Sequence, residues 1–332
     1  MMSLFSFQGL AWQDRWKLFS HVEQIWEQAQ TLPTDLENRT AQEWLAATGQ
    51  SVQARERIWG PLAHWLTGND LARLSAATFV QLLSTIFLND ASDARLTHMP
   101  GSIEQRIMAP ITRALGHGPI EFQTLTARPH LRFGERGVHD IRLQDGTTIQ
   151  AQWYVFALSP HQLLALLPER LLTRYAYFAH VTDLTYLDEV VVQLTCREAT
   201  HTPRLVLLPG RPFHQLALTP LGSGEISCRL SSLGDSLANL TDDQLVDAAI
   251  AELSQIFPNM VPKDILTHAI FREPHAALSL APGTARLRPL QHSPIRNMLV
   301  AGAWTDTGWP ANLESALISA RRCTEIVTGR PA

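Results

Sequence analysis

The sequence of 332 residues contains little cysteine and no long apolar run. Its three cysteines, Cys196, Cys228 and Cys323, lie far apart without CxxC spacing, which predicts free buried thiols in a reducing compartment. No apolar run reaches the roughly 18 residues of a membrane-spanning helix. The N-terminus also lacks the basic start and apolar centre of a signal peptide. We therefore expect a cytoplasmic protein, soluble or with peripheral membrane contact.

Composition also argues against a metal site and a nucleic-acid partner. The 13 histidines are scattered, with no HExxH motif and no His/Cys cluster at ligand spacing, so no metal is predicted. A formal charge of −4 and the lack of a Lys/Arg cluster argue against nucleic acid. A content of 45% hydrophobic and 17% charged residues is that of an ordinary globular protein, long enough for two domains.

The glycine-rich turn of a dinucleotide-binding fold is absent as well. Such a turn joins a first strand to a first helix, and its backbone N–H groups meet the pyrophosphate. Gly222-Ser-Gly224 precedes a strand-like segment instead of a helix, and Gly116-His-Gly118 follows a helix instead of a strand. Both glycine pairs are therefore predicted to be simple turns.

What the sequence does contain is a segment, residues 297–327, in the order strand, turn and helix. Its residues 298–301 form a short apolar run typical of a parallel strand buried on both faces, and Gly302 ends that run. A polar loop leads through Trp309-Pro310 into a helix. Such a unit directs backbone N–H groups and a helix dipole at one point, where an electron-rich ligand can bind. The predicted inward stripe of the helix is Leu313, Ala316 or Leu317, Ala320 and Val327.

The first hundred residues predict helices. Thr40 to Glu43 and Ser102 to Gln105 have the pattern of capping boxes, and Gly49 and Gly116 are predicted helix ends. Segments 52–66 and 75–88 predict further helices. Six of the nine tryptophans, at positions 12, 16, 26, 44, 59 and 65, lie in this part of the chain. They indicate either helix packing or a surface at a membrane interface.

Strand patterns begin at residue 120. Segments 120–126, 131–133, 138–143 and 148–158 predict strands, with hairpin turns at 134–137 and 145–146, and a helix starts at Ser159-Pro160. A second group of strands is predicted at 190–196, 205–208, 213–218 and 225–230. Thr241 then begins a helix that runs to about residue 257, and segment 265–273 returns as a strand.

Residues 299–322, LVAGAWTDTGWPANLESALISARR, resemble the C-terminal flavin motif of the amine-oxidase and phytoene-desaturase superfamily. They are most similar to the squalene-associated branch, that of hydroxysqualene dehydroxylase. The pattern there is Ala-Gly-Asp-Trp-Thr-Asp-Thr-Gly after an apolar strand, one residue, Pro-Ala-Thr, one residue and Glu-Gly-Ala. Residues 304–308, Pro310, Ala311 and Glu314 match it. Weaker similarity, as at 59–62, extends over essentially the whole chain.

Two departures from the family pattern fall inside this motif. Ala303 replaces the aspartate that, by resemblance, hydrogen-bonds a ribityl hydroxyl of FAD, and loss of that bond costs about 1.5–3 kcal/mol. Ser315 replaces a glycine that, by resemblance, lies close to the isoalloxazine, so it adds a side chain near the ring. Both departures predict weaker flavin binding.

The resemblance implies a set of site residues. Thr126 would place its backbone beside the adenine, and Ala157 would lie near the dinucleotide. Asp306 and Glu314 are the ionisable groups nearest the expected flavin, so they are the catalytic candidates. Their alternative roles are structural, with Asp306 capping the loop and Glu314 stabilising a helix N-terminus. The implied FAD-binding residues are Thr126, Ala157, Gly302, Ala303, Trp304, Thr305, Gly308, Trp309, Pro310, Ala311 and Glu314.

The predicted fold is mixed α/β, with a partial Rossmann-like FAD-binding domain and a substrate domain of helices and antiparallel sheet. Residues 1–100 are assigned to the helical part of the substrate domain, and 101–170 to a β-meander with part of the FAD-binding domain. Residues 171–275 are assigned to the substrate-domain sheet and helix, and 276–332 to the C-terminal part of the FAD-binding domain. We expect the parallel sheet to be incomplete at the edge where a βαβ unit belongs, with apolar surface exposed there.

The leading functional hypothesis is an N-terminally truncated FAD-dependent oxidoreductase of the hydroxysqualene dehydroxylase type, acting on a long isoprenoid. There the leaving hydroxyl needs a proton donor. One alternative is a non-catalytic partner that binds lipid or a sister subunit, and another is a carotenoid-type desaturase. A gene-model error, a split gene whose separate chain supplies the missing FAD-binding segment, and a degenerate paralogue would each explain the missing turn. The chain alone is expected to bind little FAD.

Overall fold

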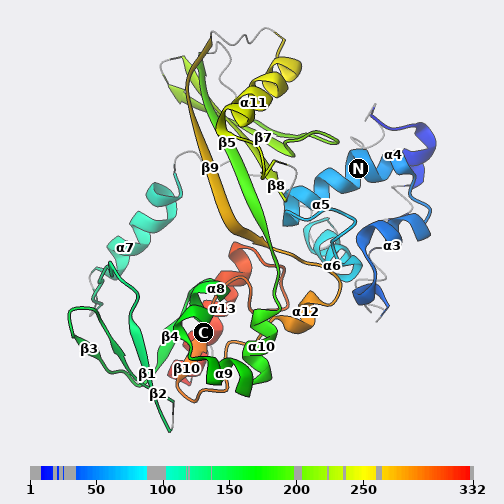
Figure 1. The fold of residues 1–332 in the computed structure, drawn as a ribbon. Coiled ribbons are helices and arrows are strands. Elements are labelled where there is room, and N and C mark those ends of the chain that lie inside the picture. Colours follow the sequence, from blue (N-terminus) through cyan, green and yellow to red (C-terminus); the bar gives the residue numbers. More distant parts are fainter. Residues whose placement is uncertain are drawn as a thin grey trace.

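The computed structural model describes residues 9–17, 21, 25, 35–87, 102–116, 118, 120–135, 137–197, 204–222, 224–234, 237–258 and 264–329. They form a mixed α/β structure with helices and three sheets, which confirms the predicted fold class (Figure 1). Trp26 lies outside the described residues. The sheets have the strand orders β1-β2-β3, β10-β4 and β6-β7-β8-β5-β9.

The helices fall into an N-terminal group, a central group and a C-terminal pair. Their bounds are η1 Leu36–Asn38, α3 Ala41–Ala47, α4 Val52–Ala54, η2 Arg55–Trp59, α5 Gly60–Thr67, α6 Ala76–Phe87, η3 Glu104–Met108, α7 Ala109–Leu115, α8 Pro160–Leu166, α9 Glu169–Arg174, α10 Ala176–Thr182, α11 Asp242–Ile256, α12 Thr284–Leu287 and α13 Leu313–Thr328. The strands are β1 His130–Gly134, β2 Gly137–Arg142, β3 Thr148–Ile149, β4 Tyr154–Phe156, β5 Tyr186–Arg197, β6 Arg204–Leu207, β7 Gln215–Gly222, β8 Glu225–Leu233, β9 Ile265–Leu278 and β10 Met298–Val300.

The N-terminal helices begin and end where the sequence predicts. Thr40 and Glu43 form the expected capping box of α3, with the Glu43 N–H 3.2 Å from the Thr40 hydroxyl. Elements α4, η2 and α5 make one continuous helical stretch from the Ser51 N-cap to Gly68, whose φ of 71° is left-handed. Glycine reaches that conformation without the steric penalty that a Cβ brings, so it ends the helix.

The tryptophans divide between the two predicted roles. Trp44 and Trp59 are 1% and 7% exposed, and both rings make edge contacts with the buried Phe79 of α6. Helix packing is therefore confirmed for this pair. Trp12 and Trp16 are 61% and 58% exposed, so their contribution to a membrane interface stays a prediction. In the part of the chain that is described, no helix is long and apolar enough to cross a bilayer.

The five-stranded antiparallel sheet is built on the long strands β5 and β9. β5 lies between β8 and β9, and helix α11 packs on the sheet through Leu245, Ala249 and Leu253. This arrangement is visible in the upper part of Figure 1. The four strand segments predicted between 190 and 230 are confirmed. Segment 265–273 is confirmed as well and extends to Leu278, where β9 reaches the layer that contains α8 and α10.

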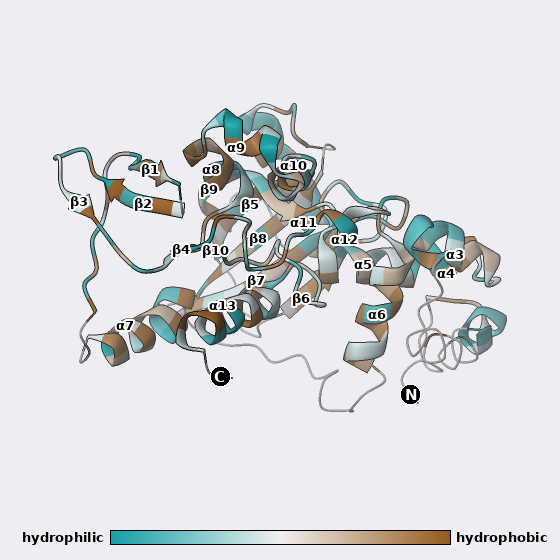
Figure 2. Cartoon of the chain, turned by 90° about the horizontal axis from the view of Figure 1, so that it is seen from below, coloured by the Kyte–Doolittle hydropathy of each residue, from teal (hydrophilic) through white to brown (hydrophobic). Residues whose placement is uncertain are grey.

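The three-stranded sheet β1-β2-β3 lies to one side in both Figure 1 and Figure 2. Arg132 on β1 pairs in register with the buried Asp140 on β2, and the two side chains form an ion pair. Segment 120–126 was expected to be a strand, but it has no regular structure and its side chains are exposed. The prediction failed because an alternating pattern makes a strand only where a neighbouring strand supplies hydrogen bonds.

Strands β4 and β10 form the parallel sheet that the sequence predicts. Their register joins Met298 to Tyr154 and Val300 to Phe156. All three residues of β10 are buried. Among the described residues β4 pairs only with β10, so the parallel sheet has two strands and the predicted incomplete edge is present.

The face of helix α13 that packs against the sheet is not the predicted one. Its small residues Ser315, Ser319 and Cys323 are the buried ones. Small side chains let helix and strand approach closely, and Cys323 Sγ lies 3.4 Å from the carbonyl oxygen of Val300. Within the stripe predicted to be inward, Leu313, Leu317 and Val327 are 65%, 57% and 41% exposed, Ala320 is exposed and Ala316 is half-buried.

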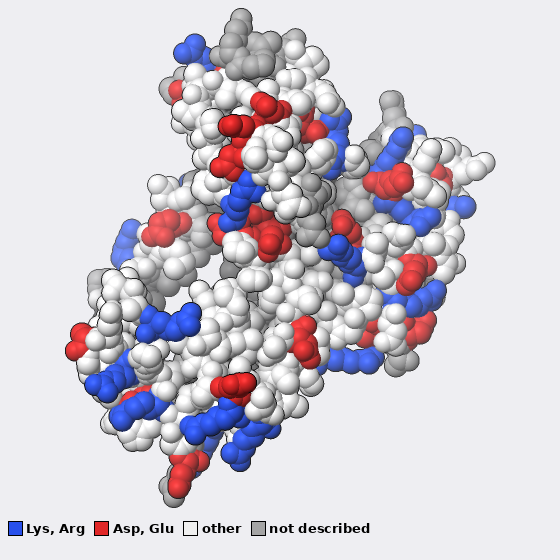
Figure 3. Space-filling view, in the orientation of Figure 1, with Lys and Arg blue, Asp and Glu red and all other residues white. Residues whose placement is uncertain are grey.

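Apolar side chains are exposed near this part of the fold, as predicted. Val155 on β4 is 48% exposed, between the buried Tyr154 and Phe156. Helices η3 and α7 expose Met108 and Ile111 at 47% and 46%, and Figure 2 shows both apolar and polar colouring on α7. Charged groups of both signs are spread over the face seen in Figure 3. The exposed surface is therefore mixed, with local apolar patches.

Asn69 joins the N-terminal helices to the end of β9. Its side chain is fully buried; its amide donates to the carbonyl of Leu278 at 3.2 Å, and its oxygen accepts the N–H of Leu280 at 2.9 Å. The carbonyl of Leu280 in turn accepts the N–H of Ser75 at 2.7 Å. These bonds hold the segment after β9 beside α6.

We expect Asn69→Ala to lower the free energy of unfolding by about 2–3 kcal/mol, because it leaves the buried backbone groups of Leu278 and Leu280 without partners. Chemical denaturation followed by circular dichroism measures this loss. Asn38→Ala is the matched control, since Asn38 is exposed and its change should cost about 0.5 kcal/mol or less. Equal stability of the two variants would contradict the role given to Asn69.

Candidate functional site

The candidate site lies where the two parallel strands end. The carboxyl ends of β4 and β10 are side by side, and the N–H of Ala301 donates to the carbonyl of Phe156 at 3.0 Å. Ala157 and Gly302 follow these residues directly, so both lie at the same edge of the sheet. Ala157 is exposed and Gly302 half-buried. Ligands of open α/β sheets bind at this edge.

Gly302 is required by the close approach of Trp304. Its φ is 147°, and a Cβ there would lie 2.6 Å from the indole Nε1 of Trp304. That indole donates to the carbonyl of Leu158 at 2.9 Å, which ties the loop to the segment after β4. The N–H of Gly302 donates to the hydroxyl of Ser319 at 2.8 Å. This amide is therefore already satisfied within the protein.

Arg288 organises the loop from inside. Its guanidinium is partly buried, and burial lowers its pKa while the nearby Asp306 opposes that shift. The cation stays charged at neutral pH, because an arginine pKa starts far above 7. Its acceptors are the carbonyl oxygens of Ala303 (3.0 Å), Trp304 (3.4 Å), Thr305 (2.6 Å) and Trp309 (2.8 Å) and the hydroxyl of Ser315 (3.3 Å).

Two further side chains complete this framework. Arg322 on α13 donates to the carbonyls of Asp306 and Thr307, each at 2.9 Å. Gln291 donates to the hydroxyl of the fully buried Thr305 at 2.9 Å. The inward carbonyls of the loop are thus bound from the segment before β10 and from α13.

Of the two catalytic candidates, Asp306 has the predicted structural role. Its Oδ1 accepts the N–H of Gly308 at 3.1 Å, and its own N–H donates to the carbonyl of Pro289 at 2.7 Å. Glu314 is exposed in the first turn of α13, where a negative charge favours the helix dipole. The structure brings Asp306 into the loop and leaves Glu314 on the surface.

Ser315 points into the loop. It is fully buried, and its hydroxyl lies 2.7 Å from that of Thr307 and 3.1 Å from the carbonyl of Ala303. The side chain of Asn312 caps α13 by accepting the N–H of Ser315 at 3.1 Å. The hydroxyl of Ser315 is therefore a structural hydrogen-bonding group between helix and loop, which the sequence pattern did not predict.

The remaining predicted residues divide into two places. Ala303, Trp309 and Ala311 are half-buried in the loop, Pro310 is buried and Gly308 is exposed with a φ of 73°. Thr126 is exposed in a separate cleft of about 290 Å³ lined by residues 123–127 and 143–145. The structure thus gathers the C-terminal motif residues with Ala157 and assigns Thr126 to another cleft.

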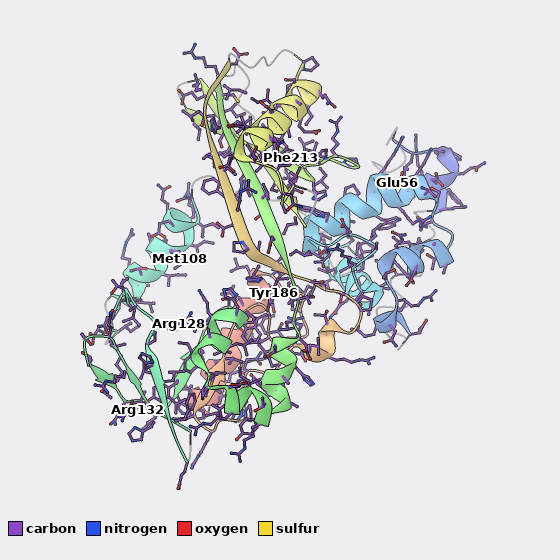
Figure 4. The ribbon with its side chains drawn as sticks, viewed as in Figure 1. Glu56, Met108, Arg128, Arg132, Tyr186 and Phe213 are labelled. Carbon is purple, nitrogen blue, oxygen red and sulfur yellow. The ribbon has the colours of Figure 1, made fainter. Side chains whose placement is uncertain are left out.

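A tyrosine and two histidines that the sequence did not single out meet where β5, β9 and α8 come together. The ring centroids of His161 and His275 are 4.8 Å apart, and those of Tyr186 and His275 are 5.5 Å apart. Figure 4 shows Tyr186 at the foot of the long strands. Its hydroxyl is buried without a hydrogen-bond partner among the described residues, and burial raises its pKa.

His275 in this group has a φ of 58°, which is uncommon for a residue with a side chain. Its N–H donates to the carboxylate of Asp188 at 2.8 Å, which holds the strained backbone in place. Strain of this kind collects at functional sites. Because these residues lie far apart in the sequence, no local motif could have predicted the group.

The sequence also missed the residues that hold the loop, namely Arg288, Gln291 and Arg322. Arg288 precedes Pro289 in a polar segment. This position was the only local feature of the sequence that could have indicated its role. Arg322 lies on a helix whose apolar stripe suggested the wrong inward face. Their role depends on carbonyl oxygens that a pattern of side chains does not display.

The chain matches known proteins over nearly its full length. The profile of the flavin containing amine oxidoreductases matches residues 3–328. The chain belongs to this family of flavoproteins. The prediction of FAD as cofactor is thereby confirmed, and the amine-oxidase part of the sequence resemblance is correct.

Curated relatives of the chain include carotenoid desaturases. 15-cis-Phytoene desaturase of an Oncidium hybrid cultivar is 24% identical over 309 residues, which cover 87% of this chain and 52% of that protein. Zeta-carotene desaturase of Synechocystis is 22% identical over 330 residues, with coverage of 90% and 67%. The chain spans about half the length of the phytoene desaturases it matches.

Solved structures share the fold at low sequence identity. A redesigned double mutant of putrescine oxidase superposes with a TM-score of 0.74 at 13% identity, covering 98% of this chain and 77% of that one. Reduced UDP-galactopyranose mutase gives a TM-score of 0.61 at 12% identity, with coverage of 97% and 73%. Both support the mixed α/β fold of this family.

The residues present fit part of a flavin site. The exposed Ala157, the glycine that leaves no room for a Cβ beside Trp304, and the start of α13 converge at one edge of the sheet. The two glycine pairs noted in the sequence are turns, as predicted. Gly222 ends β7 just before β8, and Gly116 ends α7. The fit is therefore to the portion of the cofactor that the sequence resemblance assigns to the C-terminal motif.

We expect Arg288→Met to lower the free energy of unfolding by about 2–4 kcal/mol, because the loop carbonyls lose their donor. Denaturation and the near-UV circular dichroism of the protein, to which Trp304 contributes, measure the effect. The exposed Arg286 lies two residues away and provides the control variant Arg286→Met, which should change stability little. Equal free energies of unfolding for the two variants would show that other contacts hold the loop.

Proposed function

We propose that this chain is part of a flavin-dependent oxidoreductase that acts on a long isoprenoid. The supporting observation is the similarity to phytoene and zeta-carotene desaturases over 87% and 90% of the chain. A bound flavin supplies two-electron redox chemistry. Ala157, Gly302, Ala303 and Trp304, with the start of α13, are the residues that hold it in this proposal.

The carotenoid-type reaction is the one we favour. Desaturation removes two hydrogens from neighbouring carbons of an apolar chain, and no ionised side chain has to act on a leaving group. Asp306 is engaged in capping the loop and Glu314 is exposed, which suits a reaction without an acidic catalyst. The named relatives support the same choice at low identity.

The hydroxysqualene dehydroxylase reaction is the second candidate, supported by the Trp304 to Gly308 motif. A leaving hydroxyl needs a proton or hydrogen-bond donor. The buried hydroxyl of Tyr186 lacks a partner within the described structure, and its raised pKa keeps it protonated. Tyr186 therefore replaces Asp306 and Glu314 as the donor under this hypothesis.

The proposal includes a segment that completes the parallel sheet. A glycine-rich strand, turn and helix, in the same polypeptide or in a separate chain, would pair with the free edge of β4. The exposed Val155, Leu313 and Leu317 supply apolar surface for such a segment. A non-catalytic role in binding lipid or a sister subunit is the alternative.

The 332-residue chain purified by itself should retain little flavin after gel filtration. An assembly that includes the glycine-rich segment should retain it. Each anchor of about 1.4 kcal/mol changes affinity tenfold. We expect Ala303→Asp in that assembly to tighten FAD binding about tenfold or more by restoring a charge-assisted hydrogen bond. Flavin absorbance and fluorescence titration provide the measurement.

Ala303→Asn is the matched control for this gain in affinity, because asparagine has nearly the shape of aspartate but carries no charge. Stoichiometric flavin on the described chain alone would refute the need for a further segment. Failure of every assembly to bind flavin would favour the lipid-binding or partner role.

Substrate type is tested on the flavin-loaded assembly with lipid vesicles. Phytoene is offered to the oxidised flavin with a quinone as electron acceptor, and hydroxysqualene is offered to the flavin after reduction with dithionite. We expect oxidised polyene from phytoene, detected by its visible absorbance after chromatography. Tyr186→Phe should leave that rate within about twofold, since no proton donor is needed, whereas it should abolish dehydroxylation. Tyr177→Phe is the control, because the Tyr177 hydroxyl is bonded to the carbonyl of Leu290 at 2.6 Å. Conversion of hydroxysqualene alone would overturn the preferred assignment.

A further inference from the structure

Two histidines and an aspartate come together where the N-terminal helices meet the five-stranded sheet. His64 lies on α5, Asp70 in the turn after it, and His214 in the loop that leads into β7. His214 is distant in the sequence from His64 and Asp70, so the scattered histidines gave no sign of a cluster. None belongs to the loop of residues 302–311 or to the group around Tyr186.

The three side chains have the spacing of metal ligands. One potential ligand atom from each lies within 4.8 Å of the other two. His64 Nδ1 is 3.6 Å from Asp70 Oδ1, longer than a hydrogen bond, and the two imidazole centroids are 3.7 Å apart. An ion with bonds of about 2.1 Å separates tetrahedral ligand atoms by roughly 3.4 Å. Tetrahedral coordination therefore requires the ligand atoms to move closer together from separations of up to 4.8 Å.

His64 is the member that needs a partner. Its side chain is 9% exposed, and within the described structure its buried Nδ1 makes no hydrogen bond. Leaving such an atom unsatisfied is costly, and buried polar groups of this kind call for an unseen water or ion. The Nδ1 faces Asp70, so an ion between them would satisfy both side chains.

The orientation of His214 also suits a ligand. The Ser232 hydroxyl lies 3.5 Å from Nδ1 of His214, which leaves Nε2 of the ring for another partner. A hydroxyl beside the second ring nitrogen is the arrangement that fixes metal-bound histidines. His214 and Ser232 both belong to the five-stranded sheet region, whereas His64 and Asp70 belong to the helices.

The cluster opens into a cleft of about 680 Å³, whose lining includes Glu56, Arg57 and Arg211. Figure 4 shows Glu56 on the helical side of this region and Phe213, next to His214, on the sheet side. The two arginines do not oppose a cation strongly, because Arg211 pairs with Glu252 and Arg57 donates to the carbonyl of Gly9 at 2.8 Å. The cleft gives an ion a path from solvent.

We propose that His64, Asp70 and His214 bind a divalent transition-metal ion, and that zinc is the ion this ligand set fits best. Two imidazoles and one carboxylate are zinc ligands, and the cleft leaves a fourth position for water. The ion cross-links α5 to the loop before β7, and so joins the helical part to the five-stranded sheet. This inference is independent of the proposed flavin reaction.

The test uses the purified chain after treatment with a chelator. Zinc is added and binding is followed by calorimetry, with thermal unfolding recorded in parallel. We expect one equivalent of zinc to bind and to raise the Tm, since an ion that binds the folded state stabilises it. The d–d absorption of the cobalt-substituted protein should report tetrahedral coordination. Absence of a one-to-one complex would overturn the proposal.

Variants identify the ligands. Asp70→Asn, His64→Ala and His214→Ala should each weaken zinc binding about 100-fold, equal to about 2.7 kcal/mol, and remove the rise in Tm. Asp70 is exposed, so Asp70→Asn tests the site even if a histidine variant does not fold. His161→Ala and Asp145→Asn alter the same residue types elsewhere and should bind as the unaltered chain does. Equal binding by all variants would show adventitious surface binding and refute the site.

Discussion

The interaction on which the candidate site depends is the binding of loop carbonyl oxygens by the guanidinium of Arg288. A partly buried cation loses hydration, and this loss is tolerable only where well-placed acceptors replace water. The loop supplies four carbonyl oxygens and α13 supplies the hydroxyl of Ser315, at 2.6–3.4 Å. Arg322 binds two further carbonyls, at 2.9 Å each. The guanidinium groups of Arg288 and Arg322 therefore fix the backbone conformation of the flavin motif.

Close packing of α13 follows from the same arrangement. The hydroxyls of Ser315 and Ser319 bind backbone atoms of the loop, and Cys323 lies against β10, so no larger side chain is suitable on this face. The larger apolar residues of the helix are then directed outward. Ser315, which stands where the family pattern has glycine, thus helps to fix the helix to the loop. Its hydroxyl is a structural group.

The N-terminal helices and the five-stranded sheet are stabilised by different interactions. Buried hydrogen bonds of Asn69 hold the N-terminal helices to the end of β9, and ring contacts of Trp44 and Trp59 with Phe79 fill the helical core. The sheet and α11 form a second core around residues such as Leu216 and Leu245. The strained His275 lies where these parts meet the layer of α8, together with the Tyr186 hydroxyl, which has no hydrogen-bond partner among the described residues.

The sequence by itself determined the elements whose signals are local. Capping at Thr40 and Thr241, the turns at glycines, the apolar run of β10 and the family motif around Trp304 could all be read from neighbouring residues. Only the tertiary structure decided which face of α13 is buried, that segment 120–126 is not a strand, and that Asp306 caps the loop. It alone gathered Arg288 with its acceptors, Tyr186 with His161 and His275, and His64 with His214. These groups unite residues far apart in the chain, and their energies depend on distance and desolvation, which no local pattern contains.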